Sequence, residues 1–331
     1  MNHLNDPFHR QINYLRLSVT DHCNYRCHYC RSEEHITHTQ KSEILTYEEI
    51  TRIIQIFAEL GVSKVRLTGG EPLLRKNLVD LIAQIKKIPN IVDLPLSTNA
   101  HLLAPLVHQL KQSGVNRINI SIDSLQNDRF KQITRGGDLR KVIQGIDAAI
   151  EAGIKPIKLN MVVMRGVNDD EIESMIDFAI NRKIDIRFIE TMPIGVSGIN
   201  TNSQHYSEAH IFKRIEAHLP NRLISLVPSK TSGPATNYAI QNSDSSVGII
   251  SAVSNHFCQS CNRLRLTAKG RLILCLGQEN SVSLRDALRS NKTNQEIKTI
   301  ILDALKHKPK RHEFDTNLNN INQAQMVEIG G

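Results

Sequence analysis

Three cysteines close to the start of the chain, Cys23, Cys27 and Cys30, form a C-x3-C-x2-C pattern. Thiolates are soft ligands that favour zinc, copper(I) and iron–sulfur clusters. A [4Fe–4S] cluster normally takes four cysteine ligands, whereas this loop supplies three. One iron would then have no protein ligand and could bind a cofactor or a substrate. The spacing therefore predicts a reactive metal centre rather than a purely structural one.

A structural zinc site is the alternative interpretation of this triplet. Three cysteines with one histidine form a common closed zinc set, and His22 and His28 lie within the same stretch. Zinc ligands usually come as C-x2–4-C pairs separated by a longer segment, so a tight triplet favours the cluster. The polar segment 31–42 carries two more histidines, His35 and His38, and we interpret it as a solvated loop.

A second triplet, Cys258, Cys261 and Cys275, lies near the end of the chain. Taken alone it is typical of a zinc ribbon that lacks one ligand, with His256 available to complete it. Two triplets that each lack a fourth cysteine are explained most simply by two [4Fe–4S] clusters, one facing a cofactor and one facing a substrate. All six cysteines belong to these two sets, which argues against disulfides and predicts a reducing, cytoplasmic location.

The elements that must position the first triplet begin with an apolar, alternating run at 14–19, which predicts a strand ending at the cysteine loop. Further apolar runs alternate with amphipathic helical segments. The runs lie at 64–67, 93–97, 117–122, 157–163 and 185–189, and the helical segments at 46–60, 78–87, 102–113, 139–152 and 169–182. This alternation predicts an α/β fold with a parallel sheet. Six βα units are too few for a closed eight-stranded barrel, so we expect a partial (βα)6 TIM-like barrel with its chemistry at the C-terminal strand ends.

Beyond about residue 220 the alternation breaks. Short runs at 223–227, 237–240, 247–250, 264–267 and 271–274, separated by Gly, Ser and Pro, predict a smaller, partly β extension. We therefore expect two domains: a partial barrel over residues 1–219 with the first cluster, and a C-terminal domain over 220–331 with the second cluster. The extension is expected to close the barrel mouth.

The composition narrows the class of partner. The chain has 331 residues and a net charge of +8, from 41 Lys and Arg against 33 Asp and Glu, which attracts anions. Aromatic residues make up 4% and Trp is absent, so a small anionic substrate is favoured over nucleic acid. We find neither a run of eighteen apolar residues nor an apolar signal region, and we expect no membrane association.

Four cations alternate with apolar residues inside four predicted strands: Arg16, Arg66, Lys158 and Arg187. A cation in such a position points either to solvent or into the barrel. If all four point inward, they converge on one cavity. Guanidinium groups suit phosphate oxygens best, so this arrangement predicts a polyphosphate site.

The cysteine loop, with Tyr29 directly before its last cysteine, resembles the radical S-adenosylmethionine (SAM) superfamily, as does the segment Gly69-Gly70-Glu71-Pro72 after the second strand. In that superfamily the open iron chelates SAM, and one electron cleaves SAM to a 5′-deoxyadenosyl radical. The resemblance implies a radical SAM barrel in which Tyr29, Gly70, Ser121 and Met192 contact SAM.

The second triplet, the segment Asn262-Arg263-Leu264-Arg265 and the terminal Gly330-Gly331 resemble the family of GTP cyclases that begin molybdenum cofactor biosynthesis. The resemblance covers the chain from about Leu15 to its last residue. It implies that the diglycine tail reaches the active site and is needed for turnover together with the first triplet. It also implies a set of GTP contacts, namely Arg16, Arg66, Ser97, Lys158, Arg187, Arg263, Leu264 and Arg265.

The implied reaction is removal of the ribose 3′ hydrogen of GTP followed by attack on C8 of guanine. The product would be (8S)-3′,8-cyclo-7,8-dihydroguanosine 5′-triphosphate, which would pass to cyclic pyranopterin monophosphate synthase. The expected reductant is flavodoxin or ferredoxin, and the enzyme is expected to be a monomer or a homodimer. Arg31-Ser32-Glu33 replaces the Leu-Pro usual after the triplet, and Ser97 stands where Thr is common. Two alternatives remain. One is another radical SAM enzyme with an auxiliary cluster, such as a peptide-modifying enzyme, and the other is a zinc-dependent scaffold protein.

Overall fold

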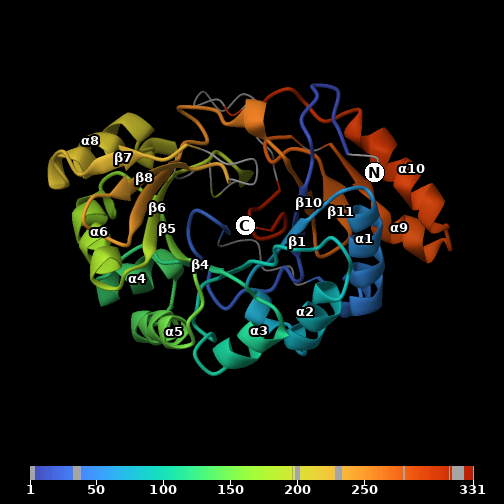
Figure 1. Ribbon diagram of the computed structural model, residues 1–331, viewed down its shortest axis with the longest axis horizontal. Coiled ribbons are helices and arrows are strands. Elements are labelled where there is room, and N and C mark those ends of the chain that lie inside the picture. The colour runs from blue at the N-terminus through green and yellow to red at the C-terminus, as the bar shows by residue number, and fades with distance from the viewer. Residues whose placement is uncertain are drawn as a thin grey trace.

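A computed structural model describes residues 4–32, 39–195, 197, 202–227, 233–278, 280–312, 314 and 324–330. Within these ranges the chain forms one twelve-stranded sheet in the order β12-β11-β10-β1-β2-β3-β4-β5-β6-β9-β8-β7. The strands form an arc with helices on its outer side, and the C-terminal end of the chain lies inside the arc (Figure 1).

Six parallel strands in sequence order make up the centre of the sheet: β1 (Tyr14–Ser18), β2 (Lys64–Thr68), β3 (Leu96–Thr98), β4 (Ile118–Ser121), β5 (Ile157–Val163) and β6 (Asp185–Glu190). Their connecting helices are α1 (Tyr47–Glu59), α2 (Leu78–Lys86), α3 (Val107–Ser113), α4 (Asn127–Thr134), α5 (Leu139–Glu151) and α6 (Ile172–Asn181). Thr46 and Glu49 form a capping box at the start of α1. The six parallel strands predicted for a partial barrel are therefore confirmed.

The C-terminal part continues the sheet at both edges. Its strands are β7 (Leu223–Ser225), β8 (Thr236–Ile240), β9 (Ser246–Ile250), β10 (Arg263–Leu266), β11 (Arg271–Ile273) and β12 (Ser281–Ser283). β9 pairs in parallel with β6, and β10 pairs in parallel with β1. The helix α8 (Glu208–His218) lies between β6 and β7, and α9 (Leu284–Arg289) and α10 (Asn294–Leu305) follow β12. The division at residue 220 stays a prediction, and the sheet runs across it without a break.

Single turns of 3-10 helix complete the described elements: η1 (Lys41–Glu43), η2 (Pro72–Leu74), η3 (Asp169–Glu171), η4 (Asn202–Gln204) and η5 (Cys258–Ser260). Among the boundaries that differ from expectation, two involve proline. β3 begins at Leu96 because Pro95 has no N–H for the ladder. α3 begins at Val107 because Pro105 disfavours helical geometry at the residue before it.

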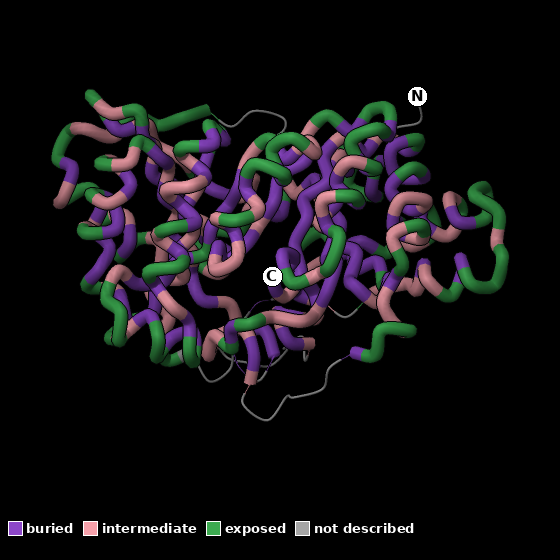
Figure 2. Tube along the Cα trace, turned by 90° about the horizontal axis from the view of Figure 1, so that it is seen from below, coloured by how far each residue is buried: buried purple, intermediate pink, exposed green. Residues whose placement is uncertain are grey.

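The two faces of the central strands have different environments. Leu15 and Leu17 are completely buried in the apolar core beneath the outer helices, whereas Tyr14 and Arg16 alternate with them on the inner face. The central strands β1 to β6 are mostly buried or half-buried, whereas β7 and β12 have no buried residue. Exposed stretches of the chain lie mainly at its periphery (Figure 2). No helix in the described part of the chain has the length and apolar character needed to cross a bilayer.

Candidate active site

The cysteine loop leaves the C-terminal end of β1 and is tied to α4. The backbone N–H groups of Arg26 and His28 donate to the carbonyls of Thr134 and Ile133, at 3.0 and 3.2 Å. Within the loop, the Tyr25 N–H donates to Cys23 Sγ at 3.4 Å. N–H groups aimed at a thiolate are a usual feature around iron–sulfur clusters, where they influence the reduction potential.

The three thiols of this loop are partly buried and act on one another electrostatically. Burial raises the pKa of Cys23 to about 11 and that of Cys30 to about 12. The pKa of Cys27 is raised well above its usual value, first by burial and then by Asp123 and the two other thiols. Such thiols ionise only beside a strong positive charge, which the irons of a cluster provide. The donor set therefore fits a three-cysteine cluster.

A single metal ion fits this loop less well. Among the described residues, no three Cys, His, Asp or Glu side chains are gathered as ligands of one ion. His28, a candidate for completing a zinc site, instead has its Nε2 atom 3.1 Å from Met164 Sδ. In a cubane each thiolate binds a different iron, so the thiols need not converge on one point. The arrangement favours the cluster over structural zinc.

The Gly69–Pro72 segment follows β2 and packs directly on the cysteine loop. Gly70 N–H donates to Thr20 O, and Glu71 N–H donates to His22 O, both at 2.7 Å. A Cβ atom on Gly70 would lie 2.3 Å from His22 O, which is a severe clash. The absence of a side chain at Gly70 is therefore required by the cysteine loop itself.

Two buried carboxylates that our sequence analysis did not single out hold this end of the barrel together. Glu71 accepts hydrogen bonds from Thr98 Oγ1 and from the Asn99 N–H, both at 2.7 Å. Asp123 accepts from Tyr29 Oη at 2.7 Å. Burial raises the pKa of Glu71 to about 7 and that of Asp123 to about 6. Their position at the ends of parallel strands was the signal that could have identified them.

The four residues predicted to contact SAM all lie at this end of the sheet. Tyr29 is in the cysteine loop, Gly70 follows β2, Ser121 is the exposed last residue of β4, and Met192 follows β6. Met192 packs against a small apolar cluster that includes Ile329 near the C-terminus. The predicted contacts therefore share one rim of the barrel, and their role toward SAM remains a prediction.

The predicted inward cations lie together on the inner face of the sheet. Arg16 is in register with Arg66 on one side and with Arg265 on the other. Arg66 Nη1 donates to Ser97 Oγ at 3.1 Å, and Lys158 Nζ donates to Asp185 Oδ2 at 2.6 Å. We call the following set of seven residues the cationic cluster: Arg16, Lys64, Arg66, Lys158, Arg187, Arg263 and Arg265.

The charges of the cationic cluster are only partly balanced. Its ion pairs with described carboxylates involve the lysines: Lys158 with Asp185 and, at 3.7 Å, Lys64 with Asp93. The Nε atoms of Arg187 and Arg263 are buried and have no hydrogen-bond partner among the described residues. Buried guanidinium donors without acceptors suit an anionic ligand with several oxygens.

Mutual repulsion is evident in the pKa values of this cluster. Burial, together with Arg66, lowers the pKa of Arg187 to about 10. Burial followed by Arg16 and Arg263 lowers the pKa of Arg265 well below its usual value. Leu264, predicted as a substrate contact through its backbone, has its side chain in the apolar core on the opposite face of β10. Its role stays a prediction.

The second triplet lies beside the cationic cluster. Cys258 and Cys261 flank the turn before β10, and Cys275 follows β11. Burial raises the pKa of Cys261, but Lys308 and Arg263 outweigh that effect and lower it. Lys308 Nζ also donates to the carbonyls of Arg263 and Leu274, at 3.1 and 2.5 Å. Basic surroundings favour thiolates, which a cluster needs as ligands.

The C-terminal segment 324–330, which we call the tail, lies inside the barrel mouth. Gly330 is buried, and its carbonyl accepts from Arg265 Nη1 at 2.7 Å. A Cβ atom on Gly330 would lie 3.0 Å from Ser18 Cβ, and its φ of 77° is in the left-handed region. Gln325 Oε1 accepts from Ser197 Oγ at 3.1 Å, which anchors the start of the tail. Gly331, predicted with Gly330 to act in turnover, and residues 33–38 of the histidine-bearing loop lie outside the described residues.

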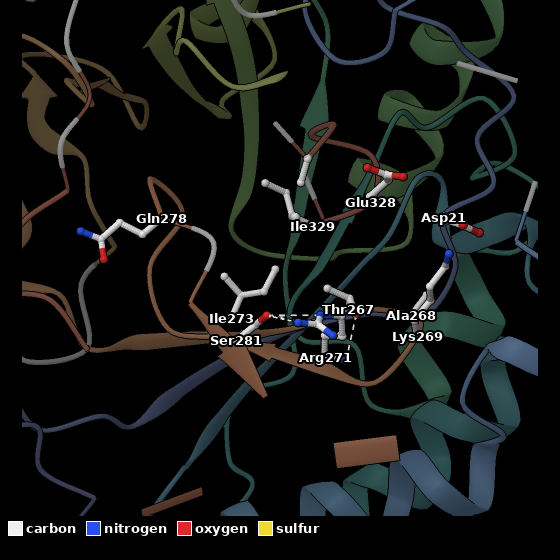
Figure 3. Close-up of a pocket in the computed structure, with 11 residues that line it drawn as sticks. Asp21, Thr267, Ala268, Lys269, Arg271, Ile273, Gln278, Ser281, Glu328 and Ile329 are labelled. Carbon is white, nitrogen blue, oxygen red and sulfur yellow. Dashed lines mark hydrogen bonds between the residues drawn. The ribbon is translucent and has the colours of Figure 1, made fainter. Parts of the chain in front are cut away.

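A cavity of about 330 Å³ separates the tail from the loop between β10 and β11. Glu328 and Ile329 of the tail form one side, and Lys269 and Arg271 form the other (Figure 3). Asp21, two residues before Cys23, completes the wall. The tail therefore reaches the barrel interior past the cysteine loop.

Two members of this site were not predicted from the sequence, Tyr14 and Lys64. Tyr14 has the same strand parity as Arg16, and Lys64 has the same parity as Arg66. Both could have been found by counting two residues back along each strand, from Arg16 to Tyr14 and from Arg66 to Lys64. Tyr14 Oη accepts from Arg66 Nε at 2.8 Å, and Lys64 Nζ lies 4.4 Å from the centre of the Tyr14 ring.

Comparisons with known families divide the chain in two. Residues 17–179 match the Radical SAM superfamily, and residues 184–314 match the family described as Molybdenum Cofactor Synthesis C. The second match begins before residue 220, at the level of β6.

Curated relatives match over almost the whole chain. The GTP 3′,8-cyclase of Hydrogenovibrio crunogenus is 51% identical over 98% of this chain and 99% of its own length. The GTP 3′,8-cyclase of Alkaliphilus metalliredigens is 43% identical over 99% of this chain and 100% of its own length.

Solved structures support the fold. The Streptococcus suis protein SuiB bound to the precursor peptide SuiA has a TM-score of 0.65 at 15% identity, covering 90% of this chain and 65% of that chain. SuiB bound to S-adenosylmethionine has a TM-score of 0.63 at 13% identity, covering 93% and 78%. The chain is 51% and 43% identical to these two cyclases over almost its whole length, and it has two three-cysteine sites. It therefore belongs to the GTP 3′,8-cyclase family of the radical SAM superfamily.

Proposed function

We propose that this protein converts GTP to (8S)-3′,8-cyclo-7,8-dihydroguanosine 5′-triphosphate, the first step of molybdenum cofactor biosynthesis. The observation that carries the proposal is the cationic cluster on the inner face of a sheet that also carries two three-cysteine sets, in a chain 51% identical to a GTP 3′,8-cyclase. A triphosphate requires several cations at fixed positions. Guanidinium groups held on neighbouring strands meet that requirement without reorganisation.

The first triplet would hold one [4Fe–4S] cluster, with SAM at its open iron. When bound there, cluster and SAM together supply the one-electron cleavage that generates a 5′-deoxyadenosyl radical. The chain's contribution is to hold the loop. Gly70 and Glu71 hydrogen-bond the backbone of the cysteine loop, and Tyr29 is oriented by its bond to Asp123. Ser121 and Met192 complete the proposed SAM contacts at the same rim.

The cationic cluster would bind the triphosphate and so align the ribose. Arg66, Arg187 and Arg263 present buried or half-buried guanidinium groups to the barrel interior, and Ser97 orients Arg66. Arg16, Lys158, Arg265 and the backbone at Leu264 complete the proposed contacts. The second triplet would hold the other cluster, facing the purine. Fixing C3′ near C8 is the main way in which such a protein lowers the barrier to ring closure.

The tail would cover the substrate and exclude water. Gly330 lies against Ser18 and is held by Arg265, so the chain end shares a guanidinium with the proposed triphosphate site. We further propose that flavodoxin or ferredoxin is the reductant and that the product passes to cyclic pyranopterin monophosphate synthase. The enzyme is proposed to be a monomer or a homodimer. All six cysteines are free, which suits the reducing cytoplasm that we predict.

Anaerobic incubation of the reconstituted enzyme with SAM, dithionite and GTP tests the proposal. We expect 5′-deoxyadenosine and a nucleotide of the same mass as GTP but with a different chromatographic retention. GTP deuterated at C3′ should transfer its label to 5′-deoxyadenosine. Deoxyadenosine that stays unlabelled, with GTP recovered unchanged, would exclude the reaction. Iron and sulfide analysis should give about eight irons per chain, whereas stoichiometric zinc without sulfide would indicate a scaffold.

A further inference from the structure

Tyr14 lies in the middle of the cationic cluster, and neither the family comparisons nor the proposed function gives it a role. It is the first residue of β1, only 3% exposed, on the inner face of the sheet. Its hydroxyl oxygen accepts a hydrogen bond from Arg66 Nε at 2.8 Å. Arg66 uses its Nη1 for Ser97, so Tyr14 and Ser97 together fix the plane of this guanidinium.

Charged groups of one sign face Tyr14 from every strand that packs against it. Arg16 follows on its own strand, and it also hydrogen-bonds the Tyr14 side chain. Lys64 lies over the ring from β2, beside Arg66. From β10, Arg263 is the register partner of Tyr14, and Arg265 acts on it electrostatically.

The carboxylate that pairs with Lys64 is shared with a second cation. Asp93, which precedes β3, pairs with Lys64 and also with Arg117. Arg187 on β6 adds a further positive charge within electrostatic reach of Tyr14. Five guanidinium groups and one ammonium therefore act on a phenol that is shielded from solvent. A buried group surrounded by cations is stabilised in its anionic form.

The pKa of Tyr14 agrees with this geometry. Burial by itself would raise it, but Arg66, Arg16, Lys64 and Arg263 together outweigh burial and lower the pKa to about 7. The phenol of Tyr14 can thus offset part of the repulsion among the arginines of the described barrel interior before any substrate arrives.

We propose that Tyr14 is the internal counter-ion of the cationic cluster: its hydroxyl is ionised in the substrate-free enzyme and takes up a proton when a polyphosphate binds. The inference rests on the proposed function for the identity of that polyphosphate, GTP. Charge and protons balance in this step, because the incoming phosphates supply negative charge and the phenolate accepts one proton from solvent. Tyr14 acts through Arg66 and its neighbours, so it is a positioning residue.

The protonation change gives the site two useful properties. Without substrate, the phenolate keeps the arginines together and holds Arg66 in its bonded orientation. With substrate, the neutral phenol no longer repels the phosphates, yet its oxygen still accepts from Arg66. Lys64, with its pKa lowered to about 8 first by burial, is a second group that can take up a proton in the same event.

The experiment uses anaerobic, cluster-loaded enzyme and Tyr14→Phe, with Tyr47→Phe as the matched control. Tyr47 also lies against an arginine, with Arg75 at 4.4 Å from its ring centre, but it is on α1 and donates its hydroxyl proton to Lys76 O. Iron content and SAM cleavage confirm that each variant is folded. The near-ultraviolet tyrosinate band is then titrated without nucleotide between pH 6 and 9 for each protein, a range of about three units around neutrality.

We expect a tyrosinate band with a midpoint near neutral pH in the wild type and in Tyr47→Phe, and its loss in Tyr14→Phe. At pH 8, saturating GTP should bleach the band, and titration calorimetry in two buffers should show that the wild type takes up about one proton more than Tyr14→Phe. Lys64 contributes to total proton uptake but not to the tyrosinate band, so the two readouts separate these groups.

Absence of the band in substrate-free wild type would overturn the proposal, as would a band that persists at saturating concentrations of both GTP and inorganic tripolyphosphate. Failure of the proposed function gives a different result. Inorganic tripolyphosphate is added as a second probe, and a band bleached by tripolyphosphate but not by GTP would uphold the counter-ion while rejecting the nucleotide. A band bleached by neither ligand would reject the counter-ion.

Discussion

Arg265 Nη1 donates a hydrogen bond of 2.7 Å to the carbonyl oxygen of Gly330, so the end of the chain lies on a guanidinium of the proposed triphosphate site. The two residues are 65 positions apart. The contact attaches the tail to β10, the strand that follows Cys258 and Cys261 and pairs with β1. Covering of the substrate by the tail and binding of its phosphates are therefore physically linked.

The two triplets should have separable roles, which a matched pair of variants can show. Cys23→Ala and Cys258→Ala should each lose about four irons per chain, because each removes one ligand of one cluster. Only Cys23→Ala should abolish cleavage of SAM to 5′-deoxyadenosine. Undiminished deoxyadenosine formation by Cys23→Ala, measured by chromatography after dithionite reduction, would refute the assignment of the first triplet.

Arg263→Ala should weaken GTP binding by roughly 10- to 100-fold, because a charge-assisted hydrogen bond contributes about 1.5–3 kcal/mol. SAM cleavage should remain possible, since Arg263 lies on β10 and not in the cysteine loop. Arg140→Ala serves as the control, because the Arg140 side chain is 83% exposed on the outer surface. Equal dissociation constants for the two variants in anaerobic calorimetry would contradict a role for Arg263 in binding.

Gly330→Ala should stop product formation while leaving both clusters in place. Alanine there meets two obstacles, a φ of 77° and a Cβ only 3.0 Å from Ser18 Cβ. Gly166→Ala is the matched control: its φ is 69°, but nothing lies within 4 Å of the added carbon. The control should cost about 1 kcal/mol of stability and retain activity. A fully active Gly330→Ala enzyme would show that the tail is an ordinary chain end.

Gly70→Ala should disrupt the first cluster site rather than SAM binding alone. The new carbon would lie 2.3 Å from His22 O, so the cysteine loop would have to move. We expect loss of about four irons per chain and of SAM cleavage, with the second cluster retained. Gly233→Ala, where an added Cβ meets nothing within 4 Å, is the control. Normal iron content in Gly70→Ala would argue that the loop tolerates the shift.

The stabilising effect of Tyr14 should grow with pH between about 7 and 10. Its pKa falls from 10.0 in the unfolded chain to about 7 in the folded protein. In that window the unfolded state binds more protons, so folding becomes more favourable as pH rises, by at most about 1.4 kcal/mol per pH unit. Anaerobic thermal unfolding of wild type and Tyr14→Phe should show a difference in midpoint that is larger at pH 9 than at pH 7. A difference independent of pH would be inconsistent with the lowered pKa.

Local patterns in the sequence were sufficient for the six βα units and for the inward cations. Alternation with apolar residues predicted that Arg16, Arg66, Lys158 and Arg187 point either to solvent or into the barrel. The structure has them on the inner face of two pairs of adjacent strands, β1 with β2 and β5 with β6. The same parity rule, applied two residues earlier in β1, would have included Tyr14. α4 was missed because its eight residues are mostly polar and carry a weak apolar pattern.

The sequence by itself determined which thiols can act as cluster ligands and which strands carry cations, because those properties depend on residue type and on spacings of a few residues. Tertiary structure alone decided that β10 pairs with β1, that Gly330 reaches Arg265, and that Tyr14 lies among the arginines. These contacts join residues far apart in the chain. They arise because the curved sheet brings strands from both ends of the chain around a shared interior, where burial and charge are set by neighbours that no local pattern specifies.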